Sequence, residues 1–165
     1  MAVLTDNKQR PIRLAHGGLA TRLVKLAGYV NFEAGSTAHR VYKGSVVMSD
    51  VSDTDGFFRA MPDSAVTPAE AADIFAGIAA ERQDVSSDEP ADGDAACAVF
   101  INGVWGFAVG SITIADLGAP AYASDDDTIT TTALNNLWVG TIVDVDASYV
   151  WVDISHAAGR TNSAT

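Results

Sequence analysis

The sequence predicts an all-β protein: a small antiparallel β-barrel or sandwich with one short helix and an extended N-terminal arm. Three observations support this fold class. Apolar segments of strand length recur along the chain, turns rich in Gly, Asp and Asn separate them, and one short segment carries a full helix-start signal. Strands at this spacing are typical of barrels and sandwiches, and 165 residues suit one domain with a sizeable core.

Residues 1–18 are predicted to form an extended, basic arm, because Pro11 and the pair Gly17-Gly18 interrupt a segment without periodicity. Charge divides the chain in a similar way. Residues 1–43 carry seven basic and two acidic side chains, a net charge of +5, whereas residues 44–165 carry three basic and nineteen acidic ones, a net charge of −16. This division suggests an arm that meets an acidic surface, such as the body of a neighbouring copy; a solvated basic face without a partner is the alternative.

Extended segments follow the arm. Residues 19–27 fit either a short helix or a strand, and the pattern does not separate the two. A turn is predicted at residues 52–56, where Asp side chains bond their own backbone and Gly56 accepts a positive φ. Pro62 ends the strand that follows this turn. The strands predicted in this part of the chain are residues 28–33, 41–42, 45–51 and 57–61.

One helix is predicted, starting at Pro68. Thr67 provides the N-cap, proline occupies the first helical position, and Glu70 completes a capping box. Gly77 weakens a longer helix by about 1 kcal/mol relative to alanine. We therefore expect a helix of barely two turns to about Asp73, followed by a strand to Arg82. A helix that continues to Arg82 is the alternative.

The rest of the chain is predicted to be β, after a solvated acidic loop at residues 84–94. Residues 95–101 and 104–109 flank Asn102-Gly103, a pair typical of the type I′ turn of a β-hairpin. Residues 156–165 are predicted to be a flexible tail, which leaves 19–155 as a single β-rich domain without an evident repeat. The remaining predicted strands are residues 111–114, 121–123, 129–132, 137–146 and 149–155.

The two closing strands are apolar on both faces, and such strands are buried under another layer or another chain. An oligomer interface on the second face is therefore expected, with a strand covered twice within one chain as the alternative. The core face is predicted to contain Leu137, Val139, Val143, Val145, Val150, Val152 and Ile154. The interface face is predicted to contain Trp138, Ile142, Tyr149 and Trp151.

Several classes of function are disfavoured by composition. A pI of about 4.3 argues against nucleic-acid binding, which depends on Lys and Arg. No apolar run approaches the roughly 20 residues that span a bilayer, and the start lacks a secretory pattern, so synthesis in a cytoplasm is expected. Cys97 is the single cysteine and is expected to be a buried, inert thiol rather than half of a disulfide.

No catalytic, cofactor or metal motif is found. His16, His39 and His156 are too scattered for a local metal signature. Asp53-x-Asp55-Gly56 has part of a calcium-loop pattern without its final Glu, and the acidic runs 92–94 and 125–127 are interpreted as turns rather than cation sites. We therefore expect a protein that is not an enzyme; a hydrolase using His16 and an aspartate is a weaker alternative.

Several segments of the chain combine short apolar strands with glycines or an acidic turn. Ala119–Thr130 is an apolar strand, an acidic turn and a threonine strand in succession, and Leu137–Val143 and Val150–Ile154 are apolar closing strands. With Val41–Val47 and Phe75–Ala79, these segments resemble the small bacteriophage capsid decoration (cement) proteins of β-barrel type. The resemblance covers roughly residues 41–155 and rests on short apolar-glycine patterns. The basic leader, the helix at Thr67 and the loop at 84–94 depart from the shortest members.

The resemblance implies a structural virion protein without catalytic residues or cofactors. Such proteins commonly form homotrimers on the outer capsid surface, where they clamp adjacent major capsid subunits. The basic side chains are then expected to bind capsid subunits or a neighbouring decoration protein: Lys8, Arg10, Arg13, Arg22 and Lys25. Deleting residues 1–18 is expected to weaken attachment and to leave the folded oligomer intact. A virion or surface module that binds carbohydrate or a host receptor through Trp105, Trp138 and Trp151 is the alternative.

Overall fold

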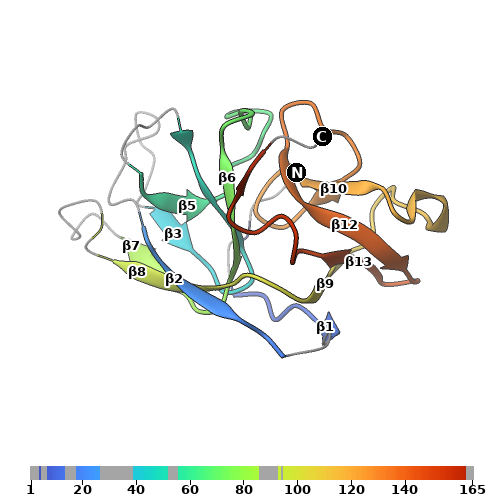
Figure 1. Ribbon diagram of the computed structural model, residues 1–165, viewed down its shortest axis with the longest axis horizontal. Helices are drawn as coiled ribbons and strands as arrows, with labels where there is room; N and C mark the ends of the chain where they lie inside the picture. The colour runs from blue at the N-terminus through green and yellow to red at the C-terminus, as the bar shows by residue number, and fades with distance from the viewer. Residues whose placement is uncertain are drawn as a thin grey trace.

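The computed structural model confirms the all-β fold class and takes the form of packed sheets rather than a closed barrel. It describes residues 4, 7–13, 18–26, 39–51, 56–85, 93 and 95–162. The predicted strand 28–33, the turn 52–55 and most of the loop 84–94 lie outside these residues. Figure 1 shows the two main sheets side by side, with the chain passing from one to the other after β8.

Two antiparallel sheets make up most of the molecule. Sheet A has the order β1 (Ile12–Arg13), β9 (Val104–Ala108), β13 (Tyr149–Asp153), β12 (Leu137–Val145), β10 (Pro120–Ala123) and β11 (Ile129–Thr130). Sheet B has the order β2 (Thr21–Lys25), β8 (Ala96–Phe100), β6 (Ile74–Ala79), β4 (Val46–Ser49) and β5 (Phe58–Ala60), and β14 (Arg160–Thr161) also pairs with β6. A separate pair joins β3 (His39–Val41) to β7 (Gln83–Val85).

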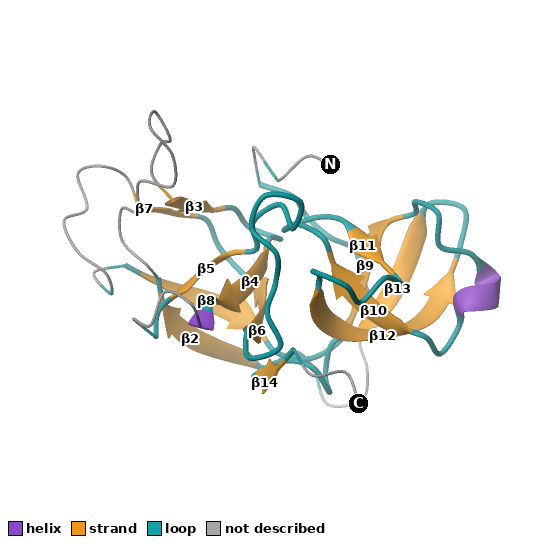
Figure 2. Cartoon of the chain, turned by 90° about the horizontal axis from the view of Figure 1, so that it is seen from above, coloured by secondary structure: helices purple, strands orange, loops and turns teal. Residues whose placement is uncertain are grey.

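The central strands of sheet B, β4 and β6, are buried on both faces, because their alternate residues enter two different apolar clusters. Phe75 and Ile78 of β6 lie in a cluster shared with sheet A, and Ala76 and Ala79 lie in a second cluster on the opposite face. Figure 2 shows sheet A on one side of sheet B, with β3 and β7 close to β5. The main core therefore lies between the two sheets.

The two sheets repeat one five-strand unit. Unit 1 consists of β2, β4, β5, β6 and β8, and unit 2 consists of β9, β10, β11, β12 and β13. The first strand of each unit pairs with the fifth, the fifth with the fourth, the fourth with the second and the second with the third. Both units thus have the same chain order, the same spatial order and antiparallel pairing throughout.

The register matches as well as the topology. Val47 pairs with Gly77 and Met48 with Phe75, so that Ala76 is an extra bulged residue in β6. In the same place in unit 2, Ala121 pairs with Gly140 and Tyr122 with Trp138, which leaves Val139 as the bulged residue of β12. Gly77 and Gly140 have matching φ values of 144° and 154°.

Backbone hydrogen bonds outside the strands follow the same correspondence. The Leu26 N–H donates to the Ala95 carbonyl at 2.9 Å, and the equivalent Val109 N–H donates to the Ser148 carbonyl at 3.3 Å. The N–H groups of Gly44 and Gly118 likewise donate to the carbonyls of Ala79 and Ile142. The expectation of no repeat is therefore corrected. Most equivalent side chains differ, as with Phe75 and Trp138, so the sequence pattern does not reveal the duplication.

The predicted helix at residues 68–73 is wrong, whereas the strand after it is confirmed as β6. Asp73 is buried, and its carboxylate accepts the N–H groups of Glu70 at 2.7 Å and Val51 at 2.9 Å. These bonds hold a turn in place of a helix. A short 3₁₀ helix occurs instead at Ile114–Asp116, where residues 111–114 were expected to be a strand, and Thr113 and Asp116 form its capping box. Residues 21–25, left open as helix or strand, form β2.

The predicted hairpin across Asn102-Gly103 is also wrong, because β8 and β9 lie in different sheets. Each of these strands already has a neighbour on both sides, so neither has a free edge for the other. Gly103 has a φ of 103° and donates its N–H to Ser155 Oγ, while Asn102 Oδ1 accepts the Ala20 N–H. The pair Asn102-Gly103 therefore forms the link between the two units.

The C-terminal segment is ordered against the body through residue 162, in contrast to the predicted flexible tail. Ala157 is fully buried, and β14 pairs with β6. The Asn162 side chain accepts the Trp138 N–H at 2.5 Å and donates to the carbonyls of Glu70 and Asn136, both at 3.0 Å. Asn162 therefore ties unit 1 to unit 2.

Candidate functional site

The acidic turn between β10 and β11 is buried rather than solvated. Asp125 Oδ1 accepts the N–H groups of Asp127 at 2.8 Å and Thr128 at 2.6 Å, so a carboxylate of the run builds the turn itself. Asp125 and Asp126 have relative exposures of 0% and 2%. Burying carboxylates in this way requires compensating charges and donors, and the N-terminal arm provides them.

Arg10 is the centre of the contact between arm and turn. Its guanidinium is 2.8 Å from Asp127 Oδ1, donates through Nε to the Gly44 carbonyl at 2.6 Å, and lies 4.0 Å from the centre of the Phe107 ring. Arg10 is 3% exposed. Burial lowers the pKa of this guanidinium, and the neighbouring aspartates, Asp127 first, act in the opposite direction. Arg10 therefore joins unit 1 at Gly44 to unit 2 at the acidic turn.

Two further groups of the arm complete the contact. Lys8 Nζ lies 2.8 Å from Asp127 Oδ2, and the Leu4 N–H donates to Asp126 Oδ1 at 2.8 Å. Asp126 Oδ2 accepts the Ser45 hydroxyl at 2.7 Å. Asp127 thus pairs with both cations of the arm, whereas Asp126 accepts two neutral donors. Burial is the largest cause that raises the pKa of Asp126, to about 6.

Changing Asp126 to Asn should stabilise the protein at pH 7.5 by about 1–2 kcal/mol. The pKa is about 6 in the folded chain and 3.8 without burial, so the folded state holds the proton more tightly. Stability from this group is fully present below about pH 4 and is lost as the pH rises through about 6. Urea unfolding from pH 5 to 8 measures the effect, and the advantage of the variant should shrink at pH 5.

Asp116→Asn is the control for this prediction, since Asp116 lies in the 3₁₀ helix, where its carboxylate accepts the Thr113 N–H at 2.7 Å. That variant should keep the pH dependence of the wild-type protein. The prediction fails if Asp126→Asn leaves the stability–pH curve between pH 5 and 8 unchanged.

Arg13 attaches the end of the arm to the closing strands. Its guanidinium is 2.5 Å from Asp144 Oδ2 and 3.5 Å from Asp146 Oδ2, and it stacks over the Trp151 ring at 3.8 Å. Hydrogen bonds from Arg13 and from the Trp151 indole are the leading causes that lower the pKa of Asp144 and Asp146, respectively. The predicted meeting of basic arm and acidic surface thus occurs within one chain, which was not the expected geometry.

The five predicted partner-binding residues are therefore divided. Lys8, Arg10 and Arg13 contact aspartates of their own chain. Arg22 and Lys25 lie on β2, with exposed side chains, and Arg22 donates to the Ala76 carbonyl at 3.2 Å. The sequence predicted the basic residues but not the contact site of the arm, which includes Gly44, Ser45 and Asp126. No sequence pattern indicates that residues 44–45 lie next to residue 126.

The face assignment of the closing strands needs a correction. Ile142, predicted for the interface face, is fully buried in the core, whereas Val143, predicted for the core, is 44% exposed. Bulges in β12 at Val139 and Val143 shift the alternation between the two faces. Trp151 is 7% exposed because Arg13 covers it, and Trp138 and Tyr149 are half-buried. Part of the second face is thus covered within the chain, which is the alternative considered above.

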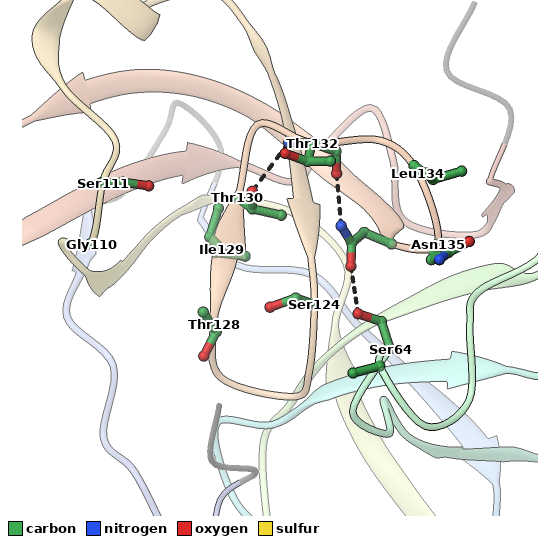
Figure 3. Close-up of a pocket in the computed structure, with 12 residues that line it drawn as sticks. Ser64, Gly110, Ser111, Ser124, Thr128, Ile129, Thr130, Thr132, Leu134 and Asn135 are labelled. Carbon is green, nitrogen blue, oxygen red and sulfur yellow. Dashed lines mark hydrogen bonds between the residues drawn. The ribbon is translucent and has the colours of Figure 1, made fainter.

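A pocket of about 410 Å³ lies where the end of β9 approaches β11, as Figure 3 shows. Its lining includes hydroxyls from both sides: Ser64, Ser111, Ser124, Thr128, Thr130 and Thr132. Asn136 crosses its wall, where it accepts the Ser64 hydroxyl at 2.7 Å and donates to the Thr132 carbonyl at 2.9 Å. The lining contains no charged or aromatic residue. It can hydrogen-bond a neutral polar group but offers no ring platform.

Reactive groups do not gather in the described part of the chain. Among those residues, no group of three His, Cys, Asp or Glu side chains could hold a metal ion. Burial raises the pKa of the Cys97 thiol to about 11, so the thiol is protonated at neutral pH. Cys97 is buried, as expected. His16, Asp53 and Asp55 lie outside the described residues. No helix that the structure describes is both long and apolar enough to cross a membrane.

The fold and these contacts define an all-β protein of two like units, fastened together by a docked N-terminal arm. Comparisons with protein-family models, curated proteins and solved structures found no match to this chain.

Proposed function

We propose that this chain is a structural virion protein that binds the outer surface of a phage capsid and stabilises the shell by clamping adjacent major capsid subunits. One observation carries the proposal. The segments that resemble decoration proteins, although separate in the sequence, form neighbouring strands. Residues 119–130 contain β10 and β11, and the two closing segments are β12 and β13, so they give the continuous order β13-β12-β10-β11.

The duplication adds support to this proposal. The earlier segments that resemble the family, residues 41–47 and 75–79, contain the first half of β4 and most of β6. These strands are the unit 1 counterparts of β10 and β12. The resemblance therefore falls on equivalent parts of both units, which is expected if a family pattern underlies each of them.

The carbohydrate-binding alternative loses its main support. Trp105 and Trp151 are 3% and 7% exposed, so their rings are not available as stacking platforms. The Trp138 indole donates to the Gly140 carbonyl at 2.9 Å and is half-buried. The pocket of Figure 3 has no aromatic residue in its lining.

The internal arm changes how a clamp would work. Since Arg10 is buried in the body, deleting residues 1–18 removes part of the fold instead of a free gripping arm. We propose that the docked arm keeps the two units rigid and that surfaces of the body contact the capsid and the other copies of a homotrimer. Many identical contacts on one lattice then stabilise the assembled shell by mass action.

Binding to purified capsids tests this function. Capsids of the phage that encodes this chain, prepared without the protein, are titrated with it, and bound protein is measured after sedimentation. We expect binding to saturate at a fixed number of copies per major capsid subunit and the melting temperature of the shell to rise. Capsids of an unrelated phage are the control. Absence of saturable binding, or binding to a glycan array instead, contradicts the proposal.

A further inference from the structure

The duplication allows one edge of the molecule to be compared with another. In unit 2, the outer edge of β9 holds a strand from the arm: Ile12 pairs with Trp105 and Arg13 with Val104. The Gly106 N–H, which points away from β13, donates to the Pro11 carbonyl at 2.9 Å. The first strand of unit 2 therefore accepts an extended basic segment along its free side.

The equivalent edge of unit 1 is β2, which lies at the border of sheet B in Figure 1. Position by position, Arg22 corresponds to Trp105 and Leu23 to Gly106, because Arg22 pairs with Val99 as Trp105 pairs with Val152. Val99 and Val152 occupy the same place in their units. In the part of the chain that the structure describes, no strand pairs with Thr21–Lys25 on this outer side, and Leu26, one residue beyond β2, makes a single parallel bridge to Phe58 of β5.

The backbone groups of Leu23 point out of the sheet. The Ala20 carbonyl accepts the Ile101 N–H at 3.0 Å, and the Leu26 N–H donates to the Ala95 carbonyl at 2.9 Å. Every second residue from Ala20 to Leu26 therefore directs its backbone N–H and C=O toward β8. The residues between them, Leu23 included, direct these groups outward. The Leu23 side chain is 69% exposed, and four of the five β2 side chains are exposed, with Val24 as the exception.

We propose that the β2 edge binds an extended, acidic segment of the major capsid protein as an additional strand of sheet B. This inference rests on the proposed capsid function. The backbone of β2 would pair with the partner, as the backbone of β9 pairs with the arm. Such strand addition gives affinity through main-chain hydrogen bonds and specificity through alternate side chains.

Charge decides what kind of segment fits. Arg22 and Lys25 make this edge basic, on a chain whose net charge is −11. A second copy's basic arm would be repelled here, whereas carboxylates would be attracted. Val24 is buried in the second cluster, and alternation therefore places Thr21, Leu23 and Lys25 on the opposite, solvent face. The fitting segment presents an apolar side chain beside Leu23 and a carboxylate beside Lys25.

Two variants test the edge in the capsid titration. Leu23→Pro removes the outward N–H without removing a bond to β8, and prolines on edge strands prevent pairing. Lys25→Glu reverses the charge and leaves the backbone unchanged. Each variant should weaken capsid binding about tenfold, and the binding that remains for Lys25→Glu should depend less on salt. Circular dichroism and melting temperature check that each variant folds.

Lys43→Glu is the matched control, because Lys43 is an exposed lysine outside β2 and the charge change is the same. It should bind capsids like the wild-type protein. The edge inference is overturned if Lys25→Glu binds capsids with wild-type affinity, or if Lys43→Glu loses as much affinity as Lys25→Glu; the proposed capsid function stands in either case. Lys25→Glu decides the question even if Leu23→Pro does not fold. Failure of the wild-type protein itself to bind capsids overturns the proposed function, and the edge inference with it.

Discussion

Arg10→Ala is expected to destabilise the protein by about 3–5 kcal/mol, the range for removing one partner of a buried ion pair. Arg10 is 3% exposed, and its guanidinium contacts Asp127, the Gly44 carbonyl and the Phe107 ring. Alanine leaves Lys8 as the remaining cation of the described arm that contacts the acidic turn. Urea denaturation at pH 7.5, followed by tryptophan fluorescence, measures the loss.

Arg13→Ala is the matched control, because Arg13 belongs to the same arm and also pairs with aspartates. Its side chain is 47% exposed, and exposed ion pairs contribute about 0–1 kcal/mol. A small loss is therefore expected from Arg13→Ala. If both variants lose similar stability, or if Arg10→Ala loses under about 1 kcal/mol, the buried contact does not fasten the arm.

A double variant separates the ion pair from the rest of the contact. Asp127→Asn removes the carboxylate that Arg10 and Lys8 share. Residues in direct contact do not act additively. Arg10→Ala combined with Asp127→Asn should therefore be destabilised by less than the sum of the single changes, because removing the Asp127 carboxylate also removes the charge that Arg10→Ala leaves without its partner.

The charge division at residue 43 predicted the site only in part. It indicated that basic residues of the N-terminal segment meet an acidic surface, and Lys8, Arg10 and Arg13 do so. It could not identify the surface, because the acidic turn is more than a hundred residues away along the chain. The burial of Asp126 beside Ser45 depends on the docking of one unit against the other, and no local pattern encodes that.

Local signals failed where tertiary contacts gave the backbone other partners. The capping box at Thr67 and Glu70 is a correct local signal, but Asp73 bonds the backbone of Glu70 and Val51 and holds a turn. The Asn102-Gly103 pair does turn the chain, but it directs the two flanking strands into different sheets. Strand existence was predicted well by composition; strand partners depend on which edges remain free.

The alternation of apolar residues assigned the faces of β12 wrongly because the strand contains bulges. One of these bulges is also the clearest sign of the duplication. A bulge shifts every following side chain to the other face, so Ile142 enters the core and Val143 does not. The bulges at Ala76 and Val139 lie at the same place in the two units, each followed by a glycine. A Gly within an apolar strand indicates a bulge, and Gly77 and Gly140 are both glycines of this kind.

Gly140→Ala is expected to destabilise the protein by about 3–5 kcal/mol, from backbone strain and overpacking together. Gly140 has a φ of 154°, and a Cβ there would lie 2.2 Å from the Asp153 carbonyl oxygen and 2.9 Å from Val152 Cγ1. The obstacle is the backbone of the paired strand β13, which cannot rotate away as a side chain would. Urea denaturation gives the free energy of unfolding.

Two further glycines sharpen this prediction. Gly110→Ala is the control, since a Cβ at Gly110 would meet nothing within 4 Å, and a change within about 0.5 kcal/mol is expected. Gly77→Ala tests the equivalence of the units, because a Cβ there would lie 2.3 Å from the Phe100 carbonyl oxygen at a φ of 144°. Gly77 and Gly140 should show similar losses. A large loss at one and a neutral result at the other would mean that the two bulges, despite their shared register, do not hold the two sheets in the same way.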